Sequence, residues 1–409
     1  MPRPHAALLA LPLAVALAPA QPKDDPLERF TYRLTTTPAA APTPALKFQF
    51  RTSAAERLSG NAALDYYRAA LLMPEWPREP EKGEKLRADQ DRWLEAKLDA
   101  FPDAEVTAFL KPFDAGFAAL DAAARREVVD WRQGVKLEHD GMDGYLREIQ
   151  KFREVSYLNR FRVRRDLARN DFDRAAVAVR SGFRLGQAVA EGPTLLQMLV
   201  GVAVCHSGWG DAVAFVGRPG SPNLYWALAS LPRPLVDPRP ALEGEEEFNV
   251  RGYRAQGPFT KADEHAFRAF MHDVRRAFPL PYQKAIAELD DIAARERERS
   301  KARGEPAEKG YAAVVPFMRK CYHVHAQLDR RMAGLMAVEA VRLHTAGAKG
   351  APPAALADII AVAVPPDPFT GRPFVYAARA DGFTLAAPPP AGEDWNSIND
   401  VRFVITFRR

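Results

Sequence analysis

The chain has 409 residues, of which 47% are apolar and 27% are charged. This is an ordinary globular balance, with enough apolar side chains for a sizeable core in two or three packed units. The formal net charge is only +5, and the basic residues are dispersed, whereas nucleic-acid-binding proteins concentrate them on one face. The composition therefore argues against nucleic acid as a partner.

Residues 1–20 have the pattern of a secretory signal peptide. Arg3 precedes an apolar run over residues 6–18, and residues 18–20 supply the small side chains that signal peptidase requires. The run is shorter than the roughly 20 residues of a membrane-spanning helix. We expect cleavage before Gln21, with an uncleaved N-terminal anchor as the alternative, and we predict export to the periplasm or the cell envelope.

The mature chain keeps two cysteines, Cys205 and Cys321. Disulfides are permitted in an exported protein. Both cysteines lie in apolar segments with the pattern of helices, so we expect buried free thiols, with a single disulfide as the alternative. The apolar stretch from Leu195 to Cys205 is too short to cross a bilayer, and no transmembrane segment is expected after signal cleavage.

Residues 21–53 are rich in Pro, Ala and Thr. Apolar and polar residues alternate at residues 30–34 and again at residues 46–51, which is typical of short β-strands. We therefore interpret this segment as a linker with short strands.

Helical spacing of apolar residues begins at residue 54, and short loops with Pro, Gly or Asn separate the helical segments. This succession predicts antiparallel helical hairpins that stack side by side. A Pro-rich bend at residues 231–240 divides a helical-hairpin domain, residues 54–230, from a second helical group, residues 231–346. The expected helices cover roughly residues 61–73, 86–99, 103–125, 142–169, 171–190, 193–216, 222–230, 240–248, 260–278, 281–302 and 308–346.

The last segment, residues 347–409, has the pattern of a small antiparallel β element with hairpins. In PDPFTGRPFVY, residues 366–376, the carboxylate of Asp367 is placed to accept amide hydrogens two or three residues on, and Gly371 is free to adopt positive φ. We interpret this stretch as a turn and not as a catalytic site. Three strands are expected to follow, at residues 372–380, 383–387 and 401–407.

The fold class predicted from these patterns is mainly α, with irregular stacked hairpins and the small C-terminal β element. Residues 164–188, RRDLARNDFDRAAVAVRSGFRLGQA, resemble a tetratricopeptide hairpin, in which a polar turn at Asn170 is followed by the aromatic Phe172 and by the small Ala175 at the helix contact. A regular register of about 34 residues does not extend along the chain, so the array is expected to be irregular.

Two wider resemblances involve longer parts of the chain. The order HTAGAKGAPPAALADI, PPDPFTGRPFVY and ADGFTL, within residues 328–403, resembles the C-terminal region of type II secretion pseudopilins. This resemblance implies a helix, a crossover segment and a small antiparallel sheet. The segments PALKFQF, GNAALDYYRAALL and VDWRQGVKLEHDG resemble a group of exported proteins of planctomycete bacteria, which implies export and a mostly helical fold but no activity.

Cys321 and His325 are the residues considered as metal ligands. They are four residues apart in a predicted helix and share a face, as zinc ligands often do. His325 also continues into an apolar stripe with Leu328 and Met332, which is typical of a core histidine. We therefore predict no metal site and no cofactor.

Arginines are dense between residues 153 and 184. A basic face for an acidic partner is one interpretation, represented by Arg153, Arg160 and Arg164. The alternative is a solvated helix surface with internal ion pairs.

The Pro-rich bend and its flanks provide a candidate binding groove. Tyr225 and Trp226 are candidates for its wall, and the candidates for a polar rim are Arg233, Asp237, Arg239 and Glu243. The alternative is a structural buttress, in which Trp226 packs under the bend and Arg239 pairs with Asp237.

The sequence contains no G-x-S-x-G elbow, P-loop, dinucleotide fingerprint or EF-hand spacing, and we predict no catalytic residues. The function expected is that of a non-catalytic exported interaction or scaffold protein, which binds a protein partner through a helical-repeat surface. An envelope hydrolase or metal-dependent enzyme is one alternative. A protein associated with the secretion apparatus through its pseudopilin-like tail is the other.

Overall fold

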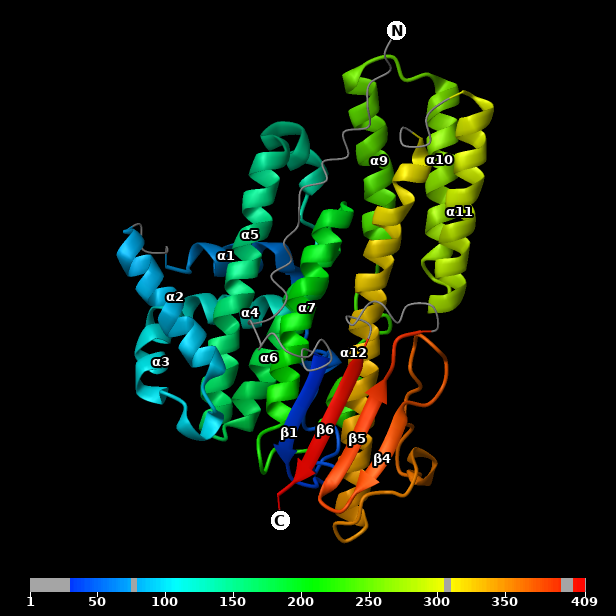
Figure 1. Ribbon diagram of the computed structural model, residues 1–409. Helices are drawn as coiled ribbons and strands as arrows, with labels where there is room; N and C mark the ends of the chain where they lie inside the picture. Colours follow the sequence, from blue (N-terminus) through cyan, green and yellow to red (C-terminus); the bar gives the residue numbers. More distant parts are fainter. Residues whose placement is uncertain (1–29, 75–78, 305–309, 391–399, 409) are drawn as a thin grey trace.

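The computed structural model describes residues 30–74, 79–304, 310–390 and 400–408, with the backbone alone for 133–144 and 256. Helices make up 63% of the protein, and a small four-stranded sheet lies at one end (Figure 1). The prediction of a mainly helical fold with a small β element is therefore confirmed at this level. The predicted signal peptide, residues 1–20, lies outside the described residues.

The N-terminal helices pack around one long helix, α5 (Gln133–Ala168). Asn61 caps the first of them by accepting the amide hydrogen of Ala63. Their shared core combines aliphatic residues with aromatic ones that include Tyr66, Trp93 and Phe161. The helices of this group are α1 (Ala62–Leu71), α2 (Pro80–Glu95), α3 (Asp103–Leu110) and α4 (Asp114–Ala124), and a short parallel pair of strands, β2 (Leu58–Asn61) and β3 (Arg126–Val128), lies beside them.

Two further helices, α6 (Phe172–Ala190) and α7 (Leu195–Val216), continue from α5 as successive hairpins. The α5–α6 turn has Asn170 at φ 57°, and Phe172 stacks on Phe215 of α7 with ring centroids 5.5 Å apart. The backbones of α6 and α7 come so close that a Cβ on Gly201 would lie 2.5 Å from the carbonyl oxygen of Gly186. Glycine at both positions permits this hairpin packing.

Helix α7 (Leu195–Val216) lies close to the expected residues 193–216, but its apolar run is longer than expected. Among the described residues it is long and apolar enough to cross a membrane, with 22 residues, and 67% of its most apolar window is buried inside the fold. The expectation that this segment is too short to cross a bilayer counted the apolar run only to Cys205. The run continues to Val216, with Asp211 as the only formally charged residue between them. In this structure α7 packs between other helices, including α5, α6 and α12.

The longest helix of the C-terminal part, α12 (Val315–Gly347), joins the helical groups to the sheet (Figure 1). It contacts α7, α8 and α11 and the strands β5 and β6. Many of its side chains are buried, including those of Leu335, Val338 and Val341. The remaining helices of this part are α8 (Tyr225–Ala229), α9 (Arg239–Gln256), α10 (Lys261–Ala277) and α11 (Tyr282–Ala302).

The sheet combines strands from both ends of the described chain. Its order is β1-β6-β5-β4, with β1 (Thr31–Thr36), β4 (Val375–Arg379), β5 (Gly382–Ala387) and β6 (Val401–Phe407). The three C-terminal strands pair antiparallel, as predicted, but β1 pairs parallel with β6, with Leu34 opposite Ile405. The prediction of a purely antiparallel element is therefore corrected to a mixed sheet. The reason is that β6 has a second free edge, which a strand from the predicted linker occupies.

The other alternating stretch of the predicted linker, residues 46–51, does not form a strand. Its alternation places Phe48 and Phe50 in the core, with their rings 6.5 Å from Phe215 and 5.7 Å from Phe183, respectively. An extended segment that buries one side against helices thus has the same alternation of apolar and polar residues as a β-strand.

Candidate functional site at the Pro-rich bend

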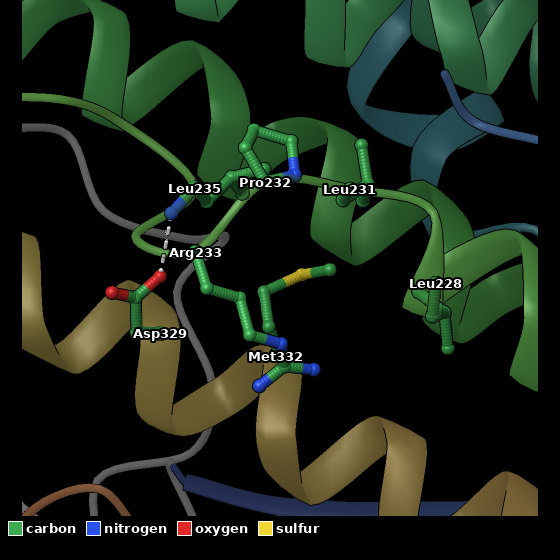
Figure 2. Close-up of a pocket in the computed structure, with 7 residues that line it drawn as sticks. All are labelled: Leu228, Leu231, Pro232, Arg233, Leu235, Asp329 and Met332. Carbon is green, nitrogen blue, oxygen red and sulfur yellow. Dashed lines mark hydrogen bonds between the residues drawn. The ribbon is translucent and has the colours of Figure 1, made fainter.

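The Pro-rich bend between α8 and α9 is held against α12 by two side chains of that helix. The carboxylate Oδ1 of Asp329 accepts the backbone N–H of Leu235 at 2.9 Å, and Figure 2 shows this contact. His325 Nε2 lies 2.7 Å from the carbonyl oxygen of Val236, so this nitrogen donates its hydrogen. Residues four apart on α12 thus satisfy neighbouring peptide groups of the bend, as buried backbone polar groups require.

The carboxyl group of Asp329 is buried, and its pKa is altered. Burial raises its pKa above the ordinary value, and the neighbouring His325, the Leu235 amide and Arg233 oppose that rise. Because both Asp329 and His325 already bond to the bend backbone, we interpret them as groups that position the bend.

A small cavity lies beneath the bend. It has a volume of about 10 Å³, which is room for one water molecule at most. In Figure 2, Arg233 extends toward α12. It donates to the sulfur of Met336 on that helix. The cavity, shown in Figure 2, is lined by Leu228, Leu231, Pro232, Arg233, Leu235, Asp329 and Met332.

A larger cavity, which we call the arginine pocket, shares Leu231 and Pro232 with the small one. Its volume is about 220 Å³, and its lining comes from three segments that are distant in the sequence. The segment before α1 contributes Phe50 and Arg51, helix α6 contributes Arg184 and Gln187, and the bend contributes Leu231 and Pro232. Arg51 and Pro232 are exposed, so the pocket opens to solvent beside them.

Arg184 is held in place by neutral groups. Its Nη1 donates to Oε1 of Gln187 at 3.0 Å, and its Nη2 donates to the carbonyl oxygen of Arg126 at 3.3 Å. The amide nitrogen of Gln187 in turn donates to the carbonyl oxygen of Leu235 in the bend, at 3.1 Å. In the described part of the chain, no carboxylate forms an ion pair with Arg184 or Arg51. The pocket therefore has two guanidinium groups available to an anion.

The residues predicted to border a groove differ in their burial and in their contacts. Tyr225 is buried and donates its hydroxyl hydrogen to the carbonyl oxygen of Ala363 at 2.6 Å, and Trp226, 36% exposed, lies edge-on to it. Arg233 lines the small cavity.

The other predicted rim residues form ion pairs outside both cavities. Arg239 forks onto Asp237, with Nη2 2.6 Å from Oδ2, at the start of α9. Glu243 of α9 pairs with Arg275 of α10 at 2.6 Å. These residues are therefore not gathered around one groove in the structure.

The arginines of the predicted basic face have different environments. Arg153 donates to Gln150 at 3.0 Å, and Arg160 lies 3.7 Å from the buried Asp211. Arg164 donates to the carbonyl oxygens of Trp93 and Ala96, and burial lowers its pKa to about 10. Several neighbouring arginines form internal ion pairs: Arg162 with Asp121, Arg169 with Asp103 and Arg180 with Glu56.

The residues considered for a metal site have other contacts. Cys321 is a buried free thiol, as is Cys205, and burial raises the pKa of both. Nε2 of His325 is engaged with Val236. Within the described ranges, no group of three or more His, Cys, Asp or Glu residues is arranged to hold a metal ion.

Sequence reasoning did not single out the residues that define the arginine pocket. Arg184 was one of many arginines in its segment, and the spacing of Gln187, three residues later on the same helix, was the one local indication of a supported guanidinium. Nothing local relates Arg51 to α6 or to the bend. Asp329, four residues after His325, follows the same helical spacing.

Comparisons with known proteins do not identify a related protein whose function could guide the interpretation. Arrangement, burial and charge at the bend are therefore the basis for any functional assignment. No family model matches the chain, and no significant match is found among curated proteins or solved structures.

Proposed function

We propose that this protein is a non-catalytic exported interaction protein, which acts in the periplasm or cell envelope and binds a carboxylate of a protein partner. The observation that carries this proposal is the arginine pocket, where Arg51 and Arg184 line a cavity of about 220 Å³ without a carboxylate partner among the described residues. Guanidinium groups bind carboxylates through paired hydrogen bonds. A carboxylate supplied by the partner completes the charge balance of the pocket.

Helical hairpins provide the surface on which this pocket is built. Arg184 and Gln187 project from α6, which packs between α5 and α7. The turn at Asn170, the stacked Phe172 and the buried Ala175 support a tetratricopeptide-like hairpin in an irregular array. Stacked hairpins are a common scaffold for protein recognition because they hold side chains on rigid elements.

A binding role agrees with the state of the ionisable groups at the bend. Asp329 and His325 hold the backbone of the bend, and Asp237 and Glu243 pair with Arg239 and Arg275. These contacts favour structural roles for the carboxylates and the histidine, whereas the two pocket arginines have no carboxylate partner among the residues that the structure describes.

The proposal is tested with the chain that begins at Gln21 and a fluorescent hexapeptide, Gly-Ser-Glu-Glu-Ala-Leu, with a free C-terminus. Fluorescence anisotropy should show saturable binding, and Arg51→Gln or Arg184→Gln should weaken it about tenfold, because a charge-assisted hydrogen bond is lost. Arg153→Gln is the matched control, since Arg153 also lacks a carboxylate partner among the described residues but does not line the pocket. Absence of binding, or an equal loss in all three variants, would contradict the proposal.

A further inference from the structure

The arginine pocket has a charged part and an apolar part within one small cavity. Arg51, Arg184 and Gln187 line the polar part, and the rest is formed by Phe50, Leu231 and Pro232. Phe50 is fully buried, and its ring packs 5.7 Å from that of Phe183. A ligand that contacts the whole lining must therefore carry its negative charge next to an apolar group.

The size of the pocket limits what this ligand is. Its volume of about 220 Å³ is smaller than the roughly 300–1,000 Å³ of sites for small molecules and cofactors. The pocket therefore suits one amino-acid residue rather than a run of residues. An internal Asp or Glu is less suitable for two reasons. The peptide chain continues on both sides of such a residue and therefore needs two exits from the pocket. The carbon that bears its carboxylate also carries no apolar side chain.

The last residue of a polypeptide has the required chemistry. Its carboxylate and its side chain are attached to the same carbon, and its peptide chain needs an exit on one side only. The structure provides such an exit where Arg51 and Pro232 are exposed. Capture of a C-terminal carboxylate is a recurring mode of peptide recognition.

We infer that the arginine pocket holds the C-terminal residue of a partner polypeptide. The free carboxylate binds at Arg184 and Arg51, and an apolar side chain lies against Leu231 and Pro232. This inference rests on the proposed function, that the pocket binds a carboxylate of a protein partner.

Arg184 is organised for this role before the ligand arrives. The Gln187 side chain and the Arg126 carbonyl group hold its guanidinium, and Gln187 is itself tied to the bend through Leu235. A side chain that is already ordered loses little conformational entropy on binding. Gln187 is thus a positioning residue that links the arginine to the apolar wall at Leu231 and Pro232.

The test compares three hexapeptides on the same chain by fluorescence anisotropy. The first is Gly-Ser-Glu-Glu-Ala-Leu with a free carboxylate, the second is the same peptide amidated at its C-terminus, and the third has glutamines in place of the glutamates and a free carboxylate. We expect the first and third to bind alike and amidation to weaken binding about tenfold. N-acetyl-leucine carries the same terminal residue and should compete at a concentration similar to that of the free peptides, because the pocket holds that one residue.

Each outcome separates the inference from the proposed function. If the amidated peptide binds as tightly as the free one and Arg51→Gln still weakens it, the pocket binds internal carboxylates, so the inference fails and the proposed function stands. If no peptide binds, or if binding ignores Arg51→Gln, both fail. If N-acetyl-leucine does not compete with the peptides, their contacts lie outside the terminal residue, and the inference is overturned.

Arg51→Gln is the decisive variant because Arg51 is exposed and has no described ion pair whose loss would affect folding. Leu231→Ala tests the apolar wall separately. It should lower the preference for a terminal leucine over a terminal glycine about fivefold, which is the scale expected for a few buried methylene groups. An unchanged preference would contradict the placement of the side chain.

Discussion

Asp367 and Arg330 form a buried bidentate ion pair, with Nε 2.8 Å from Oδ1 and Nη2 2.7 Å from Oδ2. Asp367 also accepts the amide hydrogen of Phe369, whose ring lies under the guanidinium at 4.5 Å and stacks on Tyr282 at 3.7 Å. The turn in PDPFTGRPFVY is thus one point at which the C-terminal segment is attached to α12, in addition to the contacts of α12 with β5 and β6. Its function in this structure is to hold the sheet against the helices.

Replacing Asp367 by Asn should destabilise the protein by about 3–5 kcal/mol, because it removes the carboxylate that forms a buried bidentate pair with Arg330. Urea denaturation followed by circular dichroism measures the change. Asp381→Asn is the control: Asp381 pairs with Arg379 on the surface, where both side chains are about half exposed, and less than about 1 kcal/mol should be lost. If the two variants lose similar free energies of unfolding, the buried pair contributes no more to stability than the surface pair.

The close contact of α6 and α7 predicts opposite effects for two glycines of one helix. Gly201→Ala places a Cβ 2.5 Å from the carbonyl oxygen of Gly186, and the overpacking should cost about 1–3 kcal/mol. Gly210→Ala meets no atom within 4 Å and should stabilise α7 by up to about 1 kcal/mol through helix propensity. Thermal unfolding of both variants measures the difference, and a destabilised Gly210→Ala with an unaffected Gly201→Ala would refute this packing.

Asp211 should make stability depend on pH. Burial raises its pKa from 3.8 to about 6, although Arg160 and Arg164 oppose the rise. As the pH rises, the Asp211 carboxyl ionises at a lower pH in the unfolded chain than in the folded protein. The stability that the protonated form contributes is therefore complete below about pH 4 and is lost as the pH rises to about 6. The loss amounts to roughly 3 kcal/mol.

Asp211→Asn removes this titration. The free energy of unfolding of the original protein, relative to that of the Asn variant, should therefore fall between about pH 4 and pH 6 and stay constant above that range. Denaturant unfolding of both proteins at half-unit pH intervals checks it. A difference that does not change with pH would mean that Asp211 has an ordinary pKa.

The two cysteines should be inert in the folded protein. Cys205 and Cys321 are buried free thiols whose pKa values burial raises, and the thiolate is the reactive form. Ellman's reagent should therefore react slowly under native conditions and should detect two thiols per chain in denaturant without reductant. Fewer than two would indicate a disulfide or an oxidised cysteine.

Glu191 should compete with the ligand of the arginine pocket. Burial raises its pKa, and the positive charge of Arg184 acts against that rise, so the two groups interact without a direct ion pair in the described structure. Glu191→Gln removes the competing charge and should tighten binding of Gly-Ser-Glu-Glu-Ala-Leu by roughly two- to fivefold at low salt. Weaker binding in this variant would place the peptide away from Arg184.

Local patterns predicted the helices and the C-terminal strands well, because capping, turns and apolar spacing are properties of neighbouring residues. Asn61 caps α1, Gly371 adopts positive φ, and Asp367 accepts the amide of Phe369. The partner of Asp367 could not be found this way, because Arg330 lies on another element. The parallel pairing of β1 with β6 was not predicted for the same reason, because the two strands are far apart in the sequence.

The candidate site was predictable only in its position. The Pro-rich bend was identified, but the residues chosen around it were its sequence neighbours. The arginine pocket instead joins Phe50 and Arg51 to Arg184 and Gln187, and no periodicity relates these segments. Charge density did not identify the pocket arginine either. Arg162 and Arg169 of the same region form ion pairs with carboxylates, as the alternative interpretation expected, whereas the hydrogen bonds of Arg184 in the described structure go to neutral groups.

The most direct measurement of the central claim is nitrogen-15 NMR of arginine side chains during titration with Gly-Ser-Glu-Glu-Ala-Leu. Signals assigned by Arg51→Gln, Arg184→Gln and Arg153→Gln report each guanidinium separately. If the pocket binds the peptide carboxylate, the Nε–H signals of Arg51 and Arg184 should shift and saturate together, while that of Arg153 stays unchanged. Saturable binding that leaves both pocket arginines unshifted would contradict the proposal.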